Sequence, residues 1–178
     1  NYAFANRSSA THQLRGALKS HMGSEVEVEV VYDICHNIAR VEEHEVRGAS
    51  CSCCVHRKGA TRAFGGDHDE LSSKFSGIGQ PVLVPGDMGS SSFVMSGPIN
   101  GTNMAFGSSC HGAGRALSRT QARERIDGAS VKRELAEKGI SIYETHEKYL
   151  SEEAPSAYKD VDEVVRLTEN SGLARPVA

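Results

Sequence analysis

The chain has 178 residues and a mass of 19.1 kDa, about the length of one domain, which leaves little room for two complete globular cores. Apolar residues make up 38% and charged residues 24%, a composition too apolar for a disordered tail and too polar for a membrane protein. A net charge of -3 argues against nucleic-acid binding through the overall field of the protein, although it allows a local basic surface.

No run of the sequence approaches the roughly 18 uninterrupted apolar residues of a membrane-spanning helix. The first residues also lack the charged and apolar regions of a secretion signal. We therefore expect a cytoplasmic protein that does not enter a membrane.

The N-terminal region predicts a helix followed by a strand. Ser8 or Ser9 can cap a helix with apolar residues every three or four positions, and Gly23 can end it. Residues 1–22 carry the three basic residues Arg7, Arg15 and Lys19 and no acidic one. The run Glu25–Tyr32 alternates glutamate and valine, which predicts a strand with one buried and one exposed face.

Further strands are predicted in the middle of the chain. The runs 38–46 and 53–57 are typical of strands, and the span 65–79 is predicted to be a long loop because it is rich in Gly, Asp, His and Ser. The short apolar runs 82–84 and 92–95 are separated by a glycine-rich turn, so they predict two paired strands.

Helices are predicted toward the C-terminus, over 116–126, 131–138 and 160–169. Because the strands come first and the helices second, the order favours an α+β fold over a repeated βαβ unit. We expect mixed or antiparallel sheets with flanking helices, and a single domain over residues 1–178.

Charge is distributed unevenly over this C-terminal half. Residues 111–133 hold six basic residues against two acidic ones, whereas residues 144–163 hold seven acidic residues against two basic ones. Arg115, Arg119 and Arg123 recur every four residues, which would align them on one face of a helix. This stripe would either bind an external anion or face the acidic segment.

The cysteine pattern argues against a disulfide framework. Five is an odd number, and three of the cysteines crowd into Cys51–Cys54, where neighbouring residues cannot bridge one another without strain. The cluster also lacks the two spaced Cys or His pairs of a structural zinc site. We expect free thiols, with a thiol-based or zinc-based regulator as the alternative.

Three glycine-containing turns can place hydrogen-bond donors around an anion: residues 57–62, 86–92 and 110–115. In the third turn, Gly112 and Gly114 precede the predicted helix, so its free N–H groups could bind a phosphate with His111 at the edge of the pocket. The spacing is that of neither a P-loop nor a Rossmann fingerprint.

His36 is the second candidate histidine. It follows Asp33 and Cys35 at the end of a predicted strand, and all three residue types can bind a divalent metal. Strand alternation places Cys35 and His36 on opposite faces, so a structural role for His36 remains the alternative to metal binding.

Several runs resemble successive blocks of the RtcB-type RNA-splicing ligases. In family order they are YDICHNIARVEEH (32–44), VHRKGATRAF (55–64), GQPVLVPGDMGSSSFVMSG (79–97), FGSSCHGAGRALSR (106–119) and EEAPSAYKDVDEVV (152–165). The resemblance covers nearly the whole chain and corresponds to the C-terminal part of the family protein. It implies an RtcB-like fold, incomplete relative to the full family domain.

The resemblance implies an RNA ligase of tRNA splicing or RNA repair. Such an enzyme uses GTP and Mn²⁺ to join a 2',3'-cyclic phosphate or 3'-phosphate RNA end to a 5'-hydroxyl end. It implies that His111 attacks the α-phosphorus of GTP and carries the guanylyl group to the RNA 3'-phosphate, before the 5'-hydroxyl displaces GMP. A neutral imidazole suits this role because it is nucleophilic near pH 7.

The resemblance also assigns further site residues. His36 corresponds to a manganese ligand of the family. The residues implied to contact GTP or its guanosine are Asp87, Ser92, His111, Gly112, Ala113, Gly114 and Tyr158. The residues implied to bind phosphates of GTP or RNA are Lys58, Arg115 and Arg119.

The remaining metal ligands of the family have no counterpart in this sequence. We therefore expect a truncated piece or one chain of a split enzyme, with RNA, a complementing N-terminal chain and an archease-like activator as partners. The alternative is a non-catalytic fragment that binds GTP or RNA without a complete metal centre.

Overall fold

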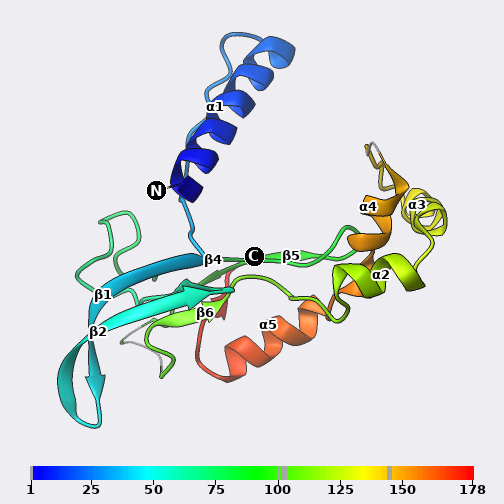
Figure 1. Cartoon of the computed structure of the whole chain (residues 1–178). Helices are drawn as coiled ribbons and strands as arrows, with labels where there is room; N and C mark the ends of the chain where they lie inside the picture. Colours follow the sequence, from blue (N-terminus) through cyan, green and yellow to red (C-terminus); the bar gives the residue numbers. More distant parts are fainter. Residues whose placement is uncertain (1, 100, 102–103, 144–145) are drawn as a thin grey trace. The chain divides into compact units, whose positions relative to one another are not determined.

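The computed structural model describes residues 2–99, 101, 104–143 and 146–178 (Figure 1). The chain divides into two compact units, Asn1–Asp33 and Ile34–Ala178. Helices and small antiparallel sheets together make an α+β protein. Within the described residues, no helix combines the length and the apolar character needed to cross a bilayer.

The smaller unit contains helix α1 (Tyr2–Met22). It begins six residues before the predicted serine caps and ends at Gly23 as predicted. The φ angle of Gly23 is +109°, and its N–H donates to the Lys19 carbonyl at 3.1 Å. No residue of α1 is buried.

The predicted strand Glu25–Tyr32 is wrong, because the structure has no β-ladder there. The extended segment is held instead by side chains of α1. Arg15 Nε donates to the Val28 carbonyl at 3.0 Å, and Arg7 forms a two-pronged ion pair with Asp33. Alternation of valine and glutamate favours an extended backbone, but a strand also needs a partner, and the described part of this unit offers none.

The larger unit begins with a long hairpin of β1 (Asn37–Val46) and β2 (Ala49–Lys58). Its two-residue loop has Arg47 and Gly48 at φ +53° and +80°, the left-handed pair that suits the twist of a hairpin. The prediction for β1 is confirmed. Strand β2 begins four residues earlier than predicted and includes the cysteine cluster, whose thiols are all free.

Two further antiparallel sheets complete the strands. The first pairs β3 (Ala60–Arg62) with β6 (Ser108–Cys110). The second has the order β4 (Pro81–Pro85), β5 (Ser92–Ser96), β7 (Arg175–Pro176). The paired strands predicted at β4 and β5 are confirmed, whereas β3, β6 and β7 are additional.

The helices of the larger unit all belong to the C-terminal part of its sequence (Figure 1). They are α2 (Arg119–Arg125), α3 (Gly128–Glu137), α4 (Glu147–Glu152), the short 3-10 helix η1 (Pro155–Ala157) and α5 (Val161–Asn170). Helix α5 begins as predicted, because Asp160 accepts hydrogen bonds from the backbone N–H groups of residues 162 and 163. Helix α2 begins three residues later than predicted, where Ser118 and Gln121 form a capping box.

Helix α5 packs on one face of the β4–β5–β7 sheet and forms the main core with it. The buried apolar residues of this core are Ala63, Val82, Val84, Met95, Ala113, Val161, Val165 and Ala174. Because Ala113 belongs to the core, the turn 110–115 is fixed to the rigid part of the unit.

A buried ion pair lies within the hairpin, and its arginine also joins the hairpin to β6. Arg57 donates to both carboxylate oxygens of Glu42, at 2.8 and 2.7 Å, and both side chains are about 1% exposed. Its other N–H groups reach the Phe106 carbonyl and Ser108 Oγ, at 2.8 and 2.9 Å. His44 Nε2 lies 3.1 Å from the same carboxylate.

This pair should make stability sensitive to Glu42. We expect Glu42→Gln to lower the free energy of unfolding by about 3 to 5 kcal/mol, because it leaves the Arg57 charge buried without its counter-ion. Urea unfolding at neutral pH measures this loss. The matched control is Glu43→Gln on the exposed face of the same strand, which should change stability by less than about 0.5 kcal/mol.

The loss should also depend on pH. Burial alone would raise the pKa of Glu42, but hydrogen bonds from Arg57 and His44 outweigh it, so the pKa lies below its ordinary 4.5. The stabilisation is therefore complete above pH 4.5 and is lost as the pH falls through the lowered value. A constant difference between wild type and Glu42→Gln from pH 7 to pH 3 would contradict this assignment.

Candidate functional site

Two candidate histidines lie against each other. His36 directly precedes β1 and His111 directly follows β6, and their rings stack with centroids 4.5 Å apart and planes 12° from parallel. The Gly59 N–H donates to the His36 carbonyl at 3.0 Å, which fixes the backbone of His36 beside the β2–β3 turn. The structure therefore brings together the two histidines that the sequence singled out separately.

Gly59 also borders the ring of His111. A Cβ atom at position 59 would lie 3.4 Å from His111 Nε2 and 3.5 Å from its Cδ2. Sequence reasoning identified the glycine-containing turn 57–62 but not this neighbour, because the contact depends on the pairing of β3 with β6. Lys58, the next predicted phosphate-binding residue, is exposed at the end of β2.

The surroundings keep the His111 imidazole neutral. Burial lowers its pKa below the ordinary 6.5, and the nearby charge of His36 lowers it further, against a hydrogen bond to its own backbone that raises it. A lowered pKa favours the neutral imidazole at neutral pH, and a neutral imidazole keeps the lone pair of one ring nitrogen. An unprotonated Nε2 at the edge of the protein is a competent nucleophile.

The glycine turn 110–115 does not open a helix, so that prediction is wrong. Helix α2 begins at Arg119, and the turn is held instead by two other segments. The Ala113 N–H donates to the Pro85 carbonyl at 2.9 Å, and the Gly114 carbonyl accepts from the Lys159 N–H at 3.0 Å. The turn is thus positioned by backbone hydrogen bonds rather than by a helix end.

Asp87 and Ser92 are connected to this turn by Pro85, which bonds to Ala113 of the turn and pairs with Ser92 in the β4–β5 ladder. The Asp87 carboxylate accepts from the Gly89 N–H and from Ser90 Oγ, both at 2.8 Å, so it shapes its own loop. Ser92 is exposed at the start of β5, opposite Pro85 in the ladder. Asp87 and Ser92, the two predicted guanosine contacts, therefore lie near Pro85, whose carbonyl accepts the hydrogen bond from Ala113.

Arg115 and Tyr158 form a connected pair. They face each other across an isolated β-bridge, and the Arg115 guanidinium lies 4.8 Å from the centre of the Tyr158 ring. Arg115 also donates to the Tyr158 hydroxyl at 3.0 Å, to the carbonyls of Leu117 and Glu152, and to the Glu153 carboxylate. Burial and then Glu153, which accepts from the hydroxyl, raise the pKa of Tyr158.

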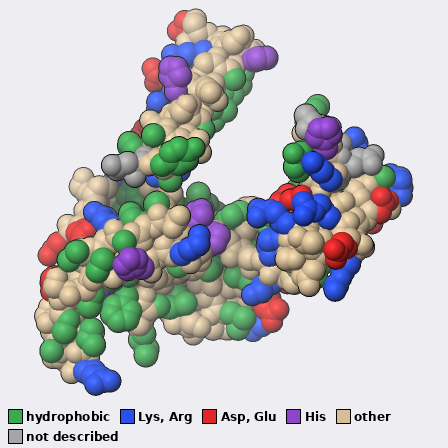
Figure 2. Space-filling view, viewed as in Figure 1, with side chains coloured by type: hydrophobic (Ala, Val, Ile, Leu, Met, Phe, Trp, Pro, Cys, Tyr) green, Lys and Arg blue, Asp and Glu red, His purple; other side chains and the backbone are tan. Residues whose placement is uncertain are grey.

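The arginine stripe faces acidic residues of its own chain. Arg123 pairs with Glu152 at 2.8 Å, and Arg119 lies 3.6 and 3.5 Å from Glu152 and Glu153. Figure 2 shows Lys and Arg side chains gathered over α2 with acidic side chains directly beside them. The sequence left two alternatives for these arginines, an external anion or the acidic segment 144–163. The structure supports the second alternative. Glu144 of that segment lies outside the described residues.

The residues do not form a complete metal centre. Within the described ranges, no three side chains among His, Cys, Asp and Glu are grouped so that they could hold a metal ion. His36 can offer one imidazole, but a divalent ion needs several protein ligands. The described residues alone therefore do not fit Mn²⁺.

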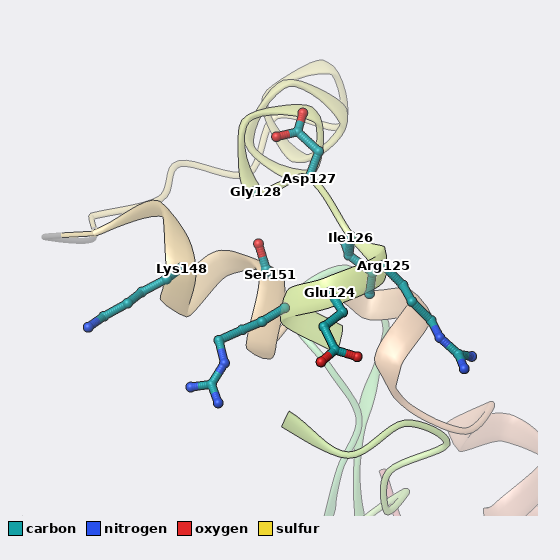
Figure 3. A pocket seen from close by; sticks show the side chains of 8 residues that line it. Glu124, Arg125, Ile126, Asp127, Gly128, Lys148 and Ser151 are labelled. Atoms are coloured by element: carbon teal, nitrogen blue, oxygen red, sulfur yellow. The ribbon is translucent and has the colours of Figure 1, made fainter. Parts of the chain in front are cut away.

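A cavity of about 540 Å³ lies between α2, α3 and α4 (Figure 3). Its lining includes Arg123, Arg125 and Lys148 together with Glu124 and Asp127. The side chains of Arg125 and Lys148 point in opposite directions in Figure 3, so they do not converge on one ligand. We assign no anion site to this cavity.

Comparison with known proteins identifies relatives over the whole chain. The family model described as tRNA-splicing ligase RtcB matches residues 1–178. A tRNA-splicing ligase RtcB of Thermococcus kodakarensis is 44% identical over 181 residues, covering 100% of this chain and 38% of the relative. An RNA-splicing ligase RtcB of Mycobacterium bovis is 45% identical, covering 100% of this chain and 40% of the relative.

A third relative gives the same picture. The RNA-splicing ligase RtcB homolog 1 of Entamoeba dispar is 43% identical, covering 99% of this chain and 34% of the relative. The chain thus spans about two fifths or less of the length of these relatives.

Arg115 and Arg119 both lie near Glu153 but should differ in their effect on stability. We expect Arg115→Ala to lower the free energy of unfolding by about 2 to 3 kcal/mol, because it orphans acceptors that are partly buried. The matched change Arg119→Ala should cost less than about 1 kcal/mol, since its side chain is 65% exposed and its ion pairs are long. Chemical denaturation of both variants measures the difference, and equal losses would contradict a structural role confined to Arg115.

Proposed function

The chain belongs to the RtcB family of tRNA-splicing ligases, and from this premise we propose that it carries the nucleotidyl-transfer part of an RNA ligase. The ligase would join a 3'-phosphate RNA end to a 5'-hydroxyl end through a guanylyl group held on His111. A 2',3'-cyclic phosphate end would first be opened by water, because guanylyl transfer needs a free phosphate oxygen.

The first step forms a bond to His111. The Nε2 lone pair attacks the α-phosphorus of GTP, the bond to the bridging oxygen of the β-phosphate breaks, and pyrophosphate leaves with that electron pair. The product is a guanylyl-histidine. A ring that stacks on His36 and has its Nε2 edge beside Gly59 presents that nitrogen in a fixed direction.

Two further displacements complete the reaction. An oxygen of the RNA 3'-phosphate attacks the guanylyl phosphorus, the N–P bond breaks, and His111 regains its lone pair. The RNA 5'-hydroxyl then attacks the activated 3'-phosphate, its proton is lost, and GMP leaves as the new phosphodiester forms. The negative charge that develops on phosphoryl oxygens in each step requires fixed donors nearby.

The observation that carries this proposal is the placement of His111. Its Nε2 edge faces a glycine, one ring face is covered by His36, and its pKa is lowered. An imidazole with only a structural role needs none of these. The backbone turn 112–114, together with Asp87, Ser92 and Tyr158, would hold GTP.

The proposal includes Mn²⁺ as a cofactor of the complete enzyme, with His36 as the ligand that this chain contributes. Mn²⁺ would neutralise phosphate charge there. Lys58, Arg115 and Arg119 would meet phosphates, although Arg115 and Arg119 also bond to acidic residues of the chain. RNA, a complementing N-terminal chain and an archease-like activator are the proposed partners.

The second candidate is a non-catalytic fragment that binds GTP or RNA. One observation favours it: the described residues contain no group of three potential metal ligands. Such a fragment would bind the nucleotide but leave His111 unmodified.

Guanylylation of His111 tests the leading proposal. The chain and a complementing N-terminal chain that supplies the remaining metal ligands are incubated with α-labelled GTP and Mn²⁺. We expect acid-labile, alkali-stable label on the wild-type chain that is lost in His111→Ala. The control is His56→Ala, an exposed histidine of β2, which should keep the label. An unlabelled wild-type chain in this mixture would refute guanylyl transfer to His111 and support the non-catalytic fragment.

RNA binding tests the phosphate contacts. We expect Lys58→Ala and Arg119→Ala each to weaken RNA binding uniformly across sequences and to reduce the slope of log affinity against log salt by about one. The exposed Lys138, at the end of α3, provides the control change Lys138→Ala. A loss confined to some RNA sequences would indicate a base contact instead.

A further inference from the structure

Gly59 touches both histidines of the site. Its N–H donates to the His36 carbonyl, and its α-carbon faces the ring edge of His111. The φ angle of +68° gives a simple reason for a glycine, because other residues rarely adopt this conformation. The ring contact is a second and independent constraint.

The contact lies at the nucleophilic edge of the ring. A Cβ atom at position 59 would meet His111 at Nε2 and Cδ2 within 4 Å, and at no other atom of the ring. An atom above the ring face would be close to more of the ring, so this position lies at the Nε2–Cδ2 edge. Stacking of His36 at 4.5 Å already covers one face.

Space outside Nε2 is therefore limited by the β2–β3 turn. At 3.4 Å a Cβ makes an ordinary contact with the unmodified ring. A phosphorus atom bonded to Nε2, with its oxygens, would occupy the space directly outside the nitrogen. A side chain at position 59 would compete for that space.

We propose that Gly59 is a positioning residue that keeps the Nε2 edge of His111 open to an electrophilic phosphorus while its N–H holds His36 against the ring. The proposal rests on the guanylyl transfer proposed above. It adds that the absence of a side chain at position 59 is required by the reaction as well as by the backbone.

Alanine and asparagine separate these two requirements. Asparagine tolerates a left-handed backbone better than alanine but carries a larger side chain. If only the backbone matters, Gly59→Asn should be the milder change, whereas a steric effect makes it the more severe one. Gly48, at φ +80° with nothing within 4 Å of a Cβ, supplies matched controls in Gly48→Ala and Gly48→Asn.

The test measures access to His111 without GTP or metal. Wild type and the four variants are treated with diethyl pyrocarbonate at neutral pH, and peptide mass spectrometry quantifies the adduct on His111 relative to that on the exposed His12. Thermal unfolding of each variant is followed in parallel, so that loss of the fold is recognised separately.

We expect the His111 to His12 ratio to fall at least about fivefold in Gly59→Asn and less in Gly59→Ala, while Asn is at least as stable as Ala at both positions. The Gly48 variants should keep the wild-type ratio. An unchanged ratio in folded Gly59→Asn, or an equal fall in Gly48→Asn, would overturn the proposal. The expected ratios together with an unlabelled wild type in the GTP experiment would refute the guanylyl transfer and leave the steric role of Gly59 standing.

Discussion

The buried ion pair of Glu42 and Arg57 determines where the two histidines lie. Arg57 is two residues before Gly59, and the same guanidinium binds the Phe106 carbonyl and Ser108 Oγ at the start of β6. His111 directly follows β6. One side chain therefore fixes the end of β2 relative to the start of β6, and the short β3–β6 ladder carries that alignment to the site. Removing two charges from water is costly, and the pair is stable because both carboxylate oxygens and several guanidinium N–H groups are hydrogen-bonded.

The rest of the site is held by hydrogen bonds between segments rather than by one large sheet. The sheets in the described part of the chain have two or three strands each, and such small sheets are stable only when they pack against something else. The Pro85 carbonyl ties β4 to the turn 110–115, and Arg115 ties the same turn to Glu152, Glu153 and Tyr158. These links hold the turn that carries His111 against separate segments of the chain without a continuous element between them.

Sequence patterns predicted the parts of the fold that depend on local interactions. The β4–β5 hairpin and α5 were predictable because apolar periodicity, glycine turns and an Asp N-cap act over a few residues. The three-residue strands β3 and β6 are too short for any periodicity. The run 25–32 had the right alternation but no partner strand, and the arginine stripe had the right charges but an acidic segment of its own chain as neighbour.

The candidate site was predictable to a similar degree. The local motifs around His36 and His111, read with the family resemblance, identified both histidines. The stacking of their rings and the contact with Gly59 could not be derived, because both follow from strand pairing between residues far apart in the sequence.

The contacts around the two histidines join residues at very different separations in the sequence. The hairpin closes through the two residues Arg47 and Gly48, whereas Arg57 reaches Phe106 across 49 residues. Closing the longer loop costs more conformational entropy, which the hydrogen bonds from Arg57 to Phe106 and Ser108 must offset. Loss of the β3–β6 ladder and of the hydrogen bonds from Arg57 to Phe106 and Ser108 would therefore separate His36 from His111 while leaving the hairpin paired. The stacking of His36 on His111 therefore depends on these long-range contacts and not on the pairing of β1 with β2.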